Sequence, residues 1–477
     1  MPRFSENFAL GKSQFELDFV DVDTNADIPL FIDPFAISQR PDRWSQDAHA
    51  SLLTFFQCVI DDIRAGRLGP ARDLLSHLRE PNETRFGFSR GRPKGAGVGP
   101  EQADDIFNAL RDSEAVRQGM LSALEECELM IPGIGPDKIS DLTTNIIRDK
   151  LASYTAEQCN LHGIATRQVA LPGWFDAPRR QWANDYINLP VVDGRPILLC
   201  PKAIARHQFS YDHRGYYRHY ILDFLQSEHL HAGSALVHAL KNGKHVVYKK
   251  DLEAIHPCAK SFLFEFSREH PDVLADYKEA LSKLEAAKLE TPIGDDDEQH
   301  IAAMLRIALA ATPGGPDAAG AYHRLMVGVL EFVFFPDLVN PVKEREIHDG
   351  RKRIDIQMEN SARSGPFYNL HAVKQLPCAY IAAECKNYTR ELANPELDQI
   401  AGRFGPNRGK AGIVLCRGFE NRERFVQRCR DTLTDGRGLI IGVGDEVVAS
   451  WLEMIENGNR RDIRISVNRL IDEVFAH

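Results

Sequence analysis

Three charged side chains interrupt apolar stretches in the C-terminal third of the chain. Asp355 stands between Ile354 and Ile356, and Glu384 and Lys386 end a long apolar run. Successive side chains of a strand point to opposite faces, so Glu384 and Lys386 should emerge on one face. If the strand with Asp355 pairs with the strand that carries them, both carboxylates can converge on one cation.

Two carboxylates and a lysine are the set of groups that hydrolysis of a phosphodiester bond needs. Carboxylate oxygens are suitable ligands for Mg²⁺, with Mn²⁺ as a substitute, and the ion neutralises transition-state charge and activates a water. A lysine beside the ion can orient that water and stabilise charge on the phosphate. The sequence therefore predicts metal-dependent cleavage of nucleic acid.

The elements around these residues alternate between strand and helix. Two apolar helices are expected at about 298–311 and 321–335. After them we expect a strand around 345–358, a polar segment, a strand at 378–388, a helix at 395–404, a strand at 411–417, a helix at 420–434, a strand at 438–444 and a helix at 445–455. This alternation predicts an α/β fold with a three-layer mixed sheet.

This pattern resembles the PD-(D/E)XK nuclease superfamily, to which many restriction endonucleases and repair nucleases belong. The resemblance covers roughly residues 298–450 and rests on Asp355 in RIDI, on Glu384-Cys385-Lys386 at the end of an apolar strand, and on the order of the elements that follow. It implies a restriction-endonuclease-like fold in which Asp355 and Glu384 bind the metal and Lys386 assists the nucleophilic water.

Further positions match the family pattern less specifically. The resemblance implies a metal ligand at Glu331, on the helix before the first strand, and a glutamine that supports the water or a phosphate at Gln399. An ordinary acid on an amphipathic helix also explains Glu331. The spacing from Asp355 to Glu384 is longer than usual in the family, so 360–376 should form an insertion. Arg403 stands where RecB-like members have a tyrosine.

Basic residues near this motif favour a DNA partner. Arg403, Arg408 and Lys410 flank a glycine-containing loop and could contact phosphates, although a solvated turn is the alternative. The whole chain has a net charge of −10, but residues 340–430 hold 17 Lys and Arg against 11 Asp and Glu. Because binding to DNA depends on cations that displace counterions, this local surplus favours the same segment as the binding surface.

Residues 1–290 are expected to form a larger mixed α/β region that recognises or regulates. Strands are predicted near 15–23 and 28–35, helices at 51–66, 101–130 and 137–154, and a β-hairpin at 187–202 around Asp193-Gly194. Proline, glycine and three successive aspartates at 292–297 predict a junction between this region and a nuclease domain at 298–477.

Two other signals lie in the N-terminal region. Gly133 and Gly135 resemble the turn of a helix-hairpin-helix element, whose backbone amides would approach DNA phosphate at a helix start. The alternative is a plain loop that leads into a helix capped by Asp137. Histidines are dense between 207 and 238, but their spacing does not suit zinc, and their aromatic neighbours indicate a packed or recognition surface.

Taken together, these features predict a Mg²⁺-dependent DNA endonuclease. The attachment of a nuclease to a large second module suggests a prokaryotic defence effector against phage or plasmid DNA, which could act as a homo-oligomer and with a companion defence protein. The alternatives are a repair or recombination nuclease and a catalytically silent module that binds nucleic acid. The absence of a long apolar run and of a basic leader predicts a cytoplasmic protein without a membrane partner.

Overall fold

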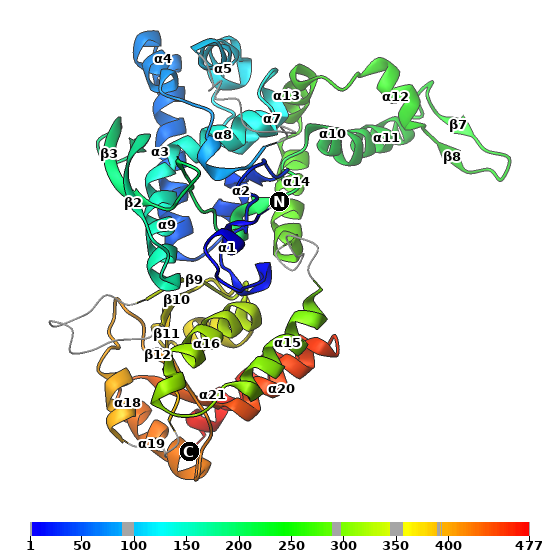
Figure 1. The fold of residues 1–477 in the computed structure, drawn as a ribbon. Helices are drawn as coiled ribbons and strands as arrows, with labels where there is room; N and C mark the ends of the chain where they lie inside the picture. Colours follow the sequence, from blue (N-terminus) through cyan, green and yellow to red (C-terminus); the bar gives the residue numbers. More distant parts are fainter. Residues whose placement is uncertain are drawn as a thin grey trace.

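The computed structural model describes residues 2–87, 100–288, 297–343, 356–388, 392 and 394–476. The described chain is mixed α/β, as expected, and it has two large hydrophobic cores. One core draws its buried side chains from 4–281 and the other from 302–474. Figure 1 shows the corresponding two parts one above the other, with an arm that projects from the first. Most of the junction predicted at 290–298 lies outside the described residues.

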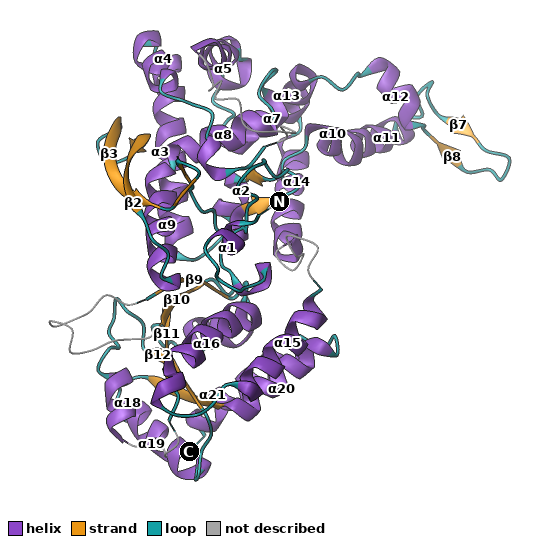
Figure 2. Ribbon diagram, viewed as in Figure 1, coloured by secondary structure: helices purple, strands orange, loops and turns teal. Residues whose placement is uncertain are grey.

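Helices predominate in the first part, and its described strands form two-stranded sheets (Figure 2). The helices are α1 (Phe4–Asn7), α2 (Pro34–Ser38), α3 (Arg43–Arg64), α4 (Leu68–Ser76), α5 (Pro100–Asp112), α6 (Glu114–Arg117), α7 (Cys127–Met130), α8 (Pro136–Ile146), α9 (Arg148–His162), α10 (His213–Tyr216), α11 (Leu222–His231), α12 (Lys249–Ile255), α13 (Lys260–Glu269) and α14 (Pro271–Lys288). The strands pair as β1 (Phe31–Ile32) with β6 (Ala205–Arg206), β2 (Arg167–Asp176) with β3 (Gln181–Leu189), β4 (Val191–Val192) with β5 (Arg195–Pro196), and β7 (His238–Ala239) with β8 (His245–Val246).

The prediction of a strand at 15–23 is wrong. The Gln14 side chain donates to the carbonyl of Phe19 at 2.8 Å and accepts from the amide of Asp21 at 2.7 Å, so a side chain satisfies backbone groups that a neighbouring strand would otherwise bind. The segment is an irregular buried loop, and the strand predicted at 28–35 shortens to the two residues of β1.

The predicted hairpin at 187–202 is confirmed at its turn. Asp193 and Gly194 have φ angles of 50° and 76°, the positive values that a tight hairpin turn requires, between the short strands β4 and β5. The longer hairpin β2–β3 was not predicted. Many side chains of β3 are exposed, so its sequence lacks the apolar alternation on which the prediction relied.

The second part is built on a five-stranded sheet in the order β13-β12-β11-β10-β9. β9, β10 and β11 are antiparallel neighbours, whereas β11, β12 and β13 are parallel. The strands are β9 (Leu338–Val342), β10 (Ile356–Asn360), β11 (Tyr380–Lys386), β12 (Ala411–Cys416) and β13 (Leu439–Gly444), and the helices are α15 (Glu298–Ala311), α16 (Ala319–Phe334), α17 (Gly365–Ala372), α18 (Asn394–Ala401), α19 (Arg422–Thr434), α20 (Asp445–Glu456) and α21 (Asp462–Phe475).

Helices cover both faces of this sheet. On one face Gly412 of β12 leaves room for α18, because a Cβ there would lie 2.7 Å from Ile400, and Gly442 of β13 does the same for Phe425 of α19. α16 packs on β9 and β11, and Trp451 of α20 stacks edge-on against Phe334 of α16 at 5.4 Å. Figure 1 shows α15, α16 and α20 gathered on one side of the sheet.

The two parts meet along β9 and β10. Gln158 of α9 donates to the carbonyl of Pro341 at 2.9 Å, and the Asp42 carboxylate accepts from the Ser361 hydroxyl at 2.9 Å. Glu359 of β10 accepts from the backbone amide of Trp44 at 3.0 Å, so the second part caps the start of α3 in the first.

Among the residues that the structure describes, no helix combines the length and the apolarity needed to cross a bilayer.

Candidate active site

Glu384 and Lys386 lie at the carboxyl end of the central strand β11. Both side chains point toward α18, as the two-residue period of a strand requires. The Lys386 ammonium lies 2.6 Å from Glu384 Oε1, and the two residues are only 1% and 8% exposed. An ion pair this short and this well buried fixes the orientation of both groups.

Gln399 of α18 approaches the same ammonium. Its Oε1 accepts from Lys386 Nζ at 3.1 Å. An ammonium has three N–H donors, of which Glu384 and Gln399 take two, so one remains for a water or a phosphate oxygen. Lys386 Nζ also lies 5.8 Å from the ring centroid of Tyr388, whose side chain is 37% exposed, so this side of the site leads to solvent.

Arg403 completes the cluster from the turn that follows α18. Its Nη1 lies 3.5 Å from Glu384 Oε2, a long contact for an ion pair. The residue is 4% exposed, and its Nε and Nη2 atoms are buried without a hydrogen-bond partner in the described structure. Because an unpaired buried donor is costly, these two N–H groups are suited to an anion that enters beside Glu384.

Asp355 lies outside the described residues. In the sequence it directly precedes Ile356, the first residue of β10. Ile356 pairs in register with Ala383, the residue before Glu384. The described residues therefore place the start of β10 beside the carboxyl end of β11.

The structure places Glu331 away from this cluster. Glu331 lies near the end of α16, just before the turn to Leu338, which pairs with Asn360 at the opposite end of the sheet. Its carboxylate is fully buried, and both oxygens lack a hydrogen-bond partner. Burial raises its pKa well above the ordinary value, as does the nearby carboxylate of Asp18, while Lys202 opposes the shift. Its predicted role as a ligand of the Glu384 site is therefore not supported.

Arg408 and Lys410 are also separated from the cluster. Gly409, between them, packs directly against the backbone of Tyr380, the first residue of β11. Four residues of extended strand correspond to about 13 Å between Tyr380 and Glu384. Lys410 instead donates to the carbonyl of Gly436 at 3.2 Å. These two residues therefore lie at the amino end of the strand and do not adjoin the Glu384 cluster, although their loop was expected beside it.

Gly133 and Gly135 form the turn before α8, and Gly133 has the positive φ of 79° expected for such a turn. However, a Cβ at Gly135 would lie 3.9 Å from a carboxylate oxygen of the buried Glu128. Lys260 donates to the carbonyl of Ile134 in this turn at 2.6 Å. A buried carboxylate beside the turn repels phosphate, so the plain-loop alternative fits this position better. The expected cap by Asp137 is wrong, because Gly135 is the N-cap residue of α8 and Asp137 lies inside the helix.

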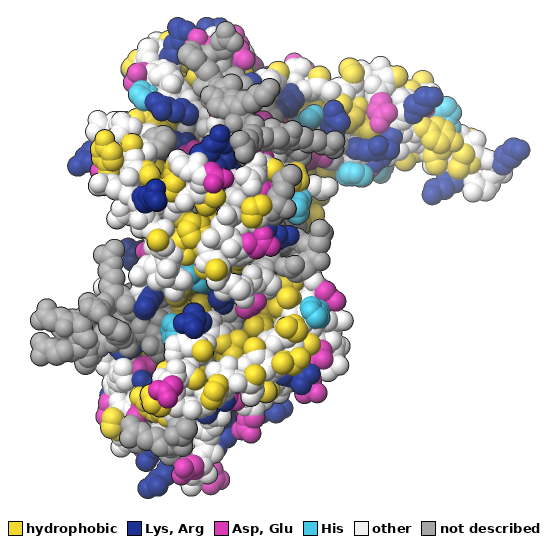
Figure 3. Space-filling view, viewed as in Figure 1, with side chains coloured by type: hydrophobic (Ala, Val, Ile, Leu, Met, Phe, Trp, Pro, Cys, Tyr) yellow, Lys and Arg dark blue, Asp and Glu magenta, His cyan; other side chains and the backbone are white. Residues whose placement is uncertain are grey.

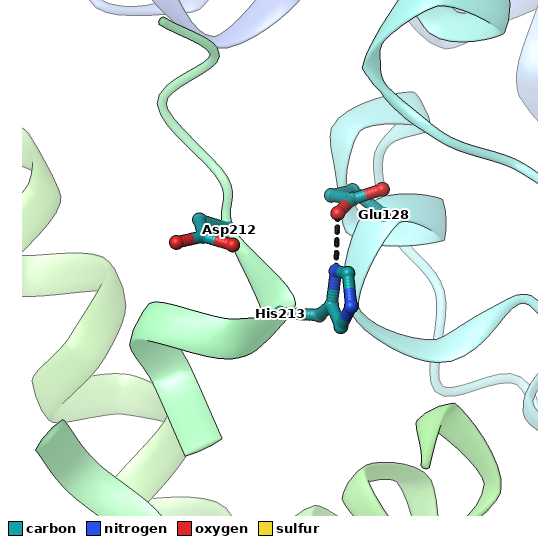
Figure 4. A group of neighbouring side chains, drawn as sticks. All are labelled: Glu128, Asp212 and His213. Atoms are coloured by element: carbon teal, nitrogen blue, oxygen red, sulfur yellow. Dashed lines mark hydrogen bonds and ion pairs between the residues drawn. The ribbon is translucent and has the colours of Figure 1, made fainter. Parts of the chain in front are cut away.

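Glu128, Asp212 and His213 bring three potential metal ligands within 4.8 Å of one another. Figure 4 shows Glu128 and His213 facing each other, joined at 2.6 Å. The other oxygen of Glu128 accepts from Lys260 at 3.1 Å, and both Asp212 oxygens accept backbone amides of α10. Existing contacts thus occupy these groups, and the lysine opposes a cation, so this cluster is best explained as an ion pair beside a helix cap.

The donor set around Glu384 fits a divalent cation in part. Glu384 supplies a hard carboxylate oxygen of the kind that Mg²⁺ prefers. The described part of the chain does not bring two further metal-ligating side chains to Glu384. A cation here would compete with Lys386 for the same carboxylate.

Comparison with known proteins gives one match. A family model described as a domain of unknown function (DUF8370) matches residues 9–212, in the first part of the chain and outside the Glu384 cluster. No curated protein and no solved structure matches the chain.

The interaction between Arg403 and Glu384 was not foreseen from the sequence, which assigned Arg403 to DNA contact alone. A signal was present, because Gln399 and Arg403 are four residues apart and therefore share a helix face. Tyr388 was likewise missed, although it lies two residues after Lys386 and on the same strand face by parity.

Proposed function

We propose that this chain is a Mg²⁺-dependent nuclease of the PD-(D/E)XK type that hydrolyses phosphodiester bonds in DNA. One observation carries the proposal: Lys386 lies between Glu384 and Gln399 at the carboxyl end of a central strand, beside a buried arginine with two unpaired donors. The five-stranded mixed sheet with helices on both faces supports a restriction-endonuclease-like fold for residues 298–477.

Each side chain has a defined task in this proposal. Glu384 and Asp355 hold the cation, which when bound neutralises charge on the phosphoryl group and acidifies a coordinated water. Lys386 orients the attacking water with its remaining N–H, and Gln399 fixes the position of the ammonium. Arg403 donates to a non-bridging phosphate oxygen as water attacks phosphorus and the P–O bond to the leaving group breaks.

A catalytically silent module that binds nucleic acid is the second candidate. The burial of Glu384 favours this candidate, because the residue is 1% exposed and its carboxylate already lies beside the cations Lys386 and Arg403. In an active enzyme Glu384 would have to give up at least part of this pairing to hold a Mg²⁺ ion. In a silent module the same pairing would persist as a structural ion cluster.

Replacement of Lys386 separates these candidates. Lys386→Ala should lower the rate of DNA cleavage by about 10²-fold or more and leave DNA binding intact. Lys374→Ala is the matched control, because this lysine of the same part precedes the amino end of β11 and is paired with Asp472 of α21 at 3.0 Å. The assay follows supercoiled, linear and single-stranded DNA with Mg²⁺ or Mn²⁺, with and without chelator. Cleavage at the wild-type rate by Lys386→Ala, or none by the wild type on any substrate, refutes the enzyme.

The biological role that we propose is defence against phage or plasmid DNA, in the cytoplasm, as a homo-oligomer and with a companion defence protein. It is supported by the large N-terminal part attached to the nuclease-like sheet, which is an argument by analogy of architecture. Repair or recombination of cellular DNA is the alternative. Phage plating on cells that produce the wild type or Lys386→Ala tests the role: protection that survives the substitution contradicts nuclease-based defence, whereas sensitivity to DNA damage without the protein favours repair.

A further inference from the structure

A projecting arm extends from the first part of the molecule. We use this name for residues 213–256, which contain α10, α11, β7, β8 and α12. Figure 1 shows α11, α12 and the β7–β8 hairpin reaching away from both cores. The base of the arm is anchored, since Leu222, Val247 and Leu252 belong to the first hydrophobic core. The hairpin tip contributes no buried side chain between 238 and 246.

The arm is cationic in an acidic protein. Residues 213–256 contain six Lys and Arg against four Asp and Glu, and residues 236–250 contain four Lys and no Asp or Glu, although the whole chain has a net charge of −10. Figure 3 shows dark blue side chains spread along this projection and at its tip. A local surplus of cationic side chains attracts polyanions, even where the chain as a whole is acidic.

Lys241 and Lys244 at the hairpin tip, and Lys250 at the start of α12, are exposed and have no ion-pair partner among the described residues. The five residues 241–245 are all exposed, and the turn is closed by bonds between Leu240 and Lys244 and between Gly243 and Leu240. No acidic group lies within ion-pair distance of the Lys241, Lys244 or Lys250 side chains in the described structure. Their ammonium groups are therefore available to a ligand.

The tip has little with which to hold a protein by apolar contacts. Among the described residues of the arm, Leu230 at 38%, Tyr248 at 49% and Ile255 at 55% are the exposed large apolar side chains, and of these Tyr248 alone lies between 236 and 250. Interfaces between proteins usually place apolar and aromatic groups at their centre and deplete lysine there. Flexible lysines that project from a narrow hairpin are instead suited to the regularly spaced phosphates of a nucleic-acid backbone.

We propose that the arm is a DNA-binding element that contacts the phosphate backbone of duplex DNA through Lys241, Lys244 and Lys250. The proposal rests on the proposed function for its substrate class. The arm holds DNA independently of sequence, and the Glu384 cluster lies in the other part of the molecule. Binding through the arm therefore does not depend on a metal ion.

The test replaces the three lysines by alanine and measures binding to a fluorescent 30-base-pair duplex in the presence of chelator. Each phosphate contact contributes about 0.9 to the slope of log affinity against log salt. The triple variant should therefore lose about 2 to 3 from this slope and bind at least about tenfold more weakly at low salt. The substituted side chains are exposed, so folding should be unchanged.

A matched control removes the same number of cations elsewhere. Lys283, Arg72 and Arg117 are exposed but already lie 2.7 to 2.8 Å from acidic partners, so their replacement by alanine should leave the salt slope unchanged. An equal loss in both triple variants indicates a general charge effect and overturns the proposal. A wild-type slope in the arm variant also overturns it. A loss of binding to polyglutamate with DNA binding intact assigns the arm to an acidic protein and overturns it as well.

The two proposals fail in different ways. If the wild type binds DNA through the arm but never cleaves it, the enzyme proposal fails and the arm proposal stands. If the wild type cleaves DNA and the arm variant retains the wild-type salt slope, the arm proposal fails alone.

Discussion

Glu359 gives a quantitative prediction about the contact between the two parts. This residue of β10 accepts the backbone amide of Trp44 at the start of α3. Burial, with a smaller contribution from the Asp42 carboxylate, raises its pKa from the ordinary 4.5 to about 7. At about 1.4 kcal/mol per pKa unit, the ionised carboxylate costs the folded state up to roughly 3 kcal/mol above pH 7.

Glu359→Gln removes this cost and keeps an oxygen that can accept the Trp44 amide. A carboxyl group with a raised pKa binds its proton more tightly in the folded state, so its stabilising contribution is present below pH 4.5 and is lost as the pH rises through 7. The variant should therefore be more stable than the wild type by up to roughly 3 kcal/mol at pH 8. The gain should shrink toward zero as the pH approaches 4.5.

Urea unfolding of both proteins at several pH values between 5 and 8 measures this gain. Glu423→Gln is the control, since this exposed glutamate has the same charge but lies outside the contact between the parts. A gain that is the same at pH 5 and pH 8 would show that burial of the charge is not the cause. A loss of stability at pH 8 would show that the ionised carboxylate stabilises the cap.

Three further substitutions test the account of the second part. Arg403→Met removes buried donors that have no partner in the described structure, so the thermal midpoint of unfolding should not fall. The cleavage rate should fall by about 10²-fold, and a lower midpoint with an unchanged rate would contradict the proposed contact of Arg403 with phosphate. Gly412→Ala should destabilise by about 1–3 kcal/mol in urea, because its Cβ would lie 2.7 Å from Ile400, and an unchanged midpoint would exclude tight packing of α18 on the sheet. Burial raises the pKa of the Glu331 carboxyl, so Glu331→Gln should stabilise the protein increasingly as the pH rises above 4.5. Thermal unfolding at several pH values measures this gain, and a shift of the midpoint that is independent of pH would refute the reasoning.

Much of the second part could be predicted from the sequence. β11, β12 and β13 are continuous apolar runs, as expected for strands covered on both faces, and helical periodicity separates them. β9 was missed because its five residues include an asparagine and a proline, which are poor strand formers. α21 was not predicted either.

The Glu384 cluster could be predicted in part from local periodicity. The two-residue period of β11 predicts that Glu384 and Lys386 share a face, whereas a place for Gln399 beside them was implied by the family resemblance. The position of Glu331 depends on which end of α16 faces the carboxyl end of β11, and that is set by the turn into β9, not by the helix pattern. Arg408 was misplaced for a similar reason, because the loop before a parallel strand returns to the opposite end of the sheet.

The contact of α9 with the edge strand β9 bears on whether the second part is stable as a separate fragment. β9 forms one border of the sheet, and its outer backbone is approached by α9, with Gln158 bound to the carbonyl of Pro341. A fragment that begins at 297 would leave this border bare, and unpaired strand amides and carbonyls recruit strands from other chains. The N-terminal part thus shields this border of the sheet, and truncation would be expected to yield aggregates in place of a folded fragment.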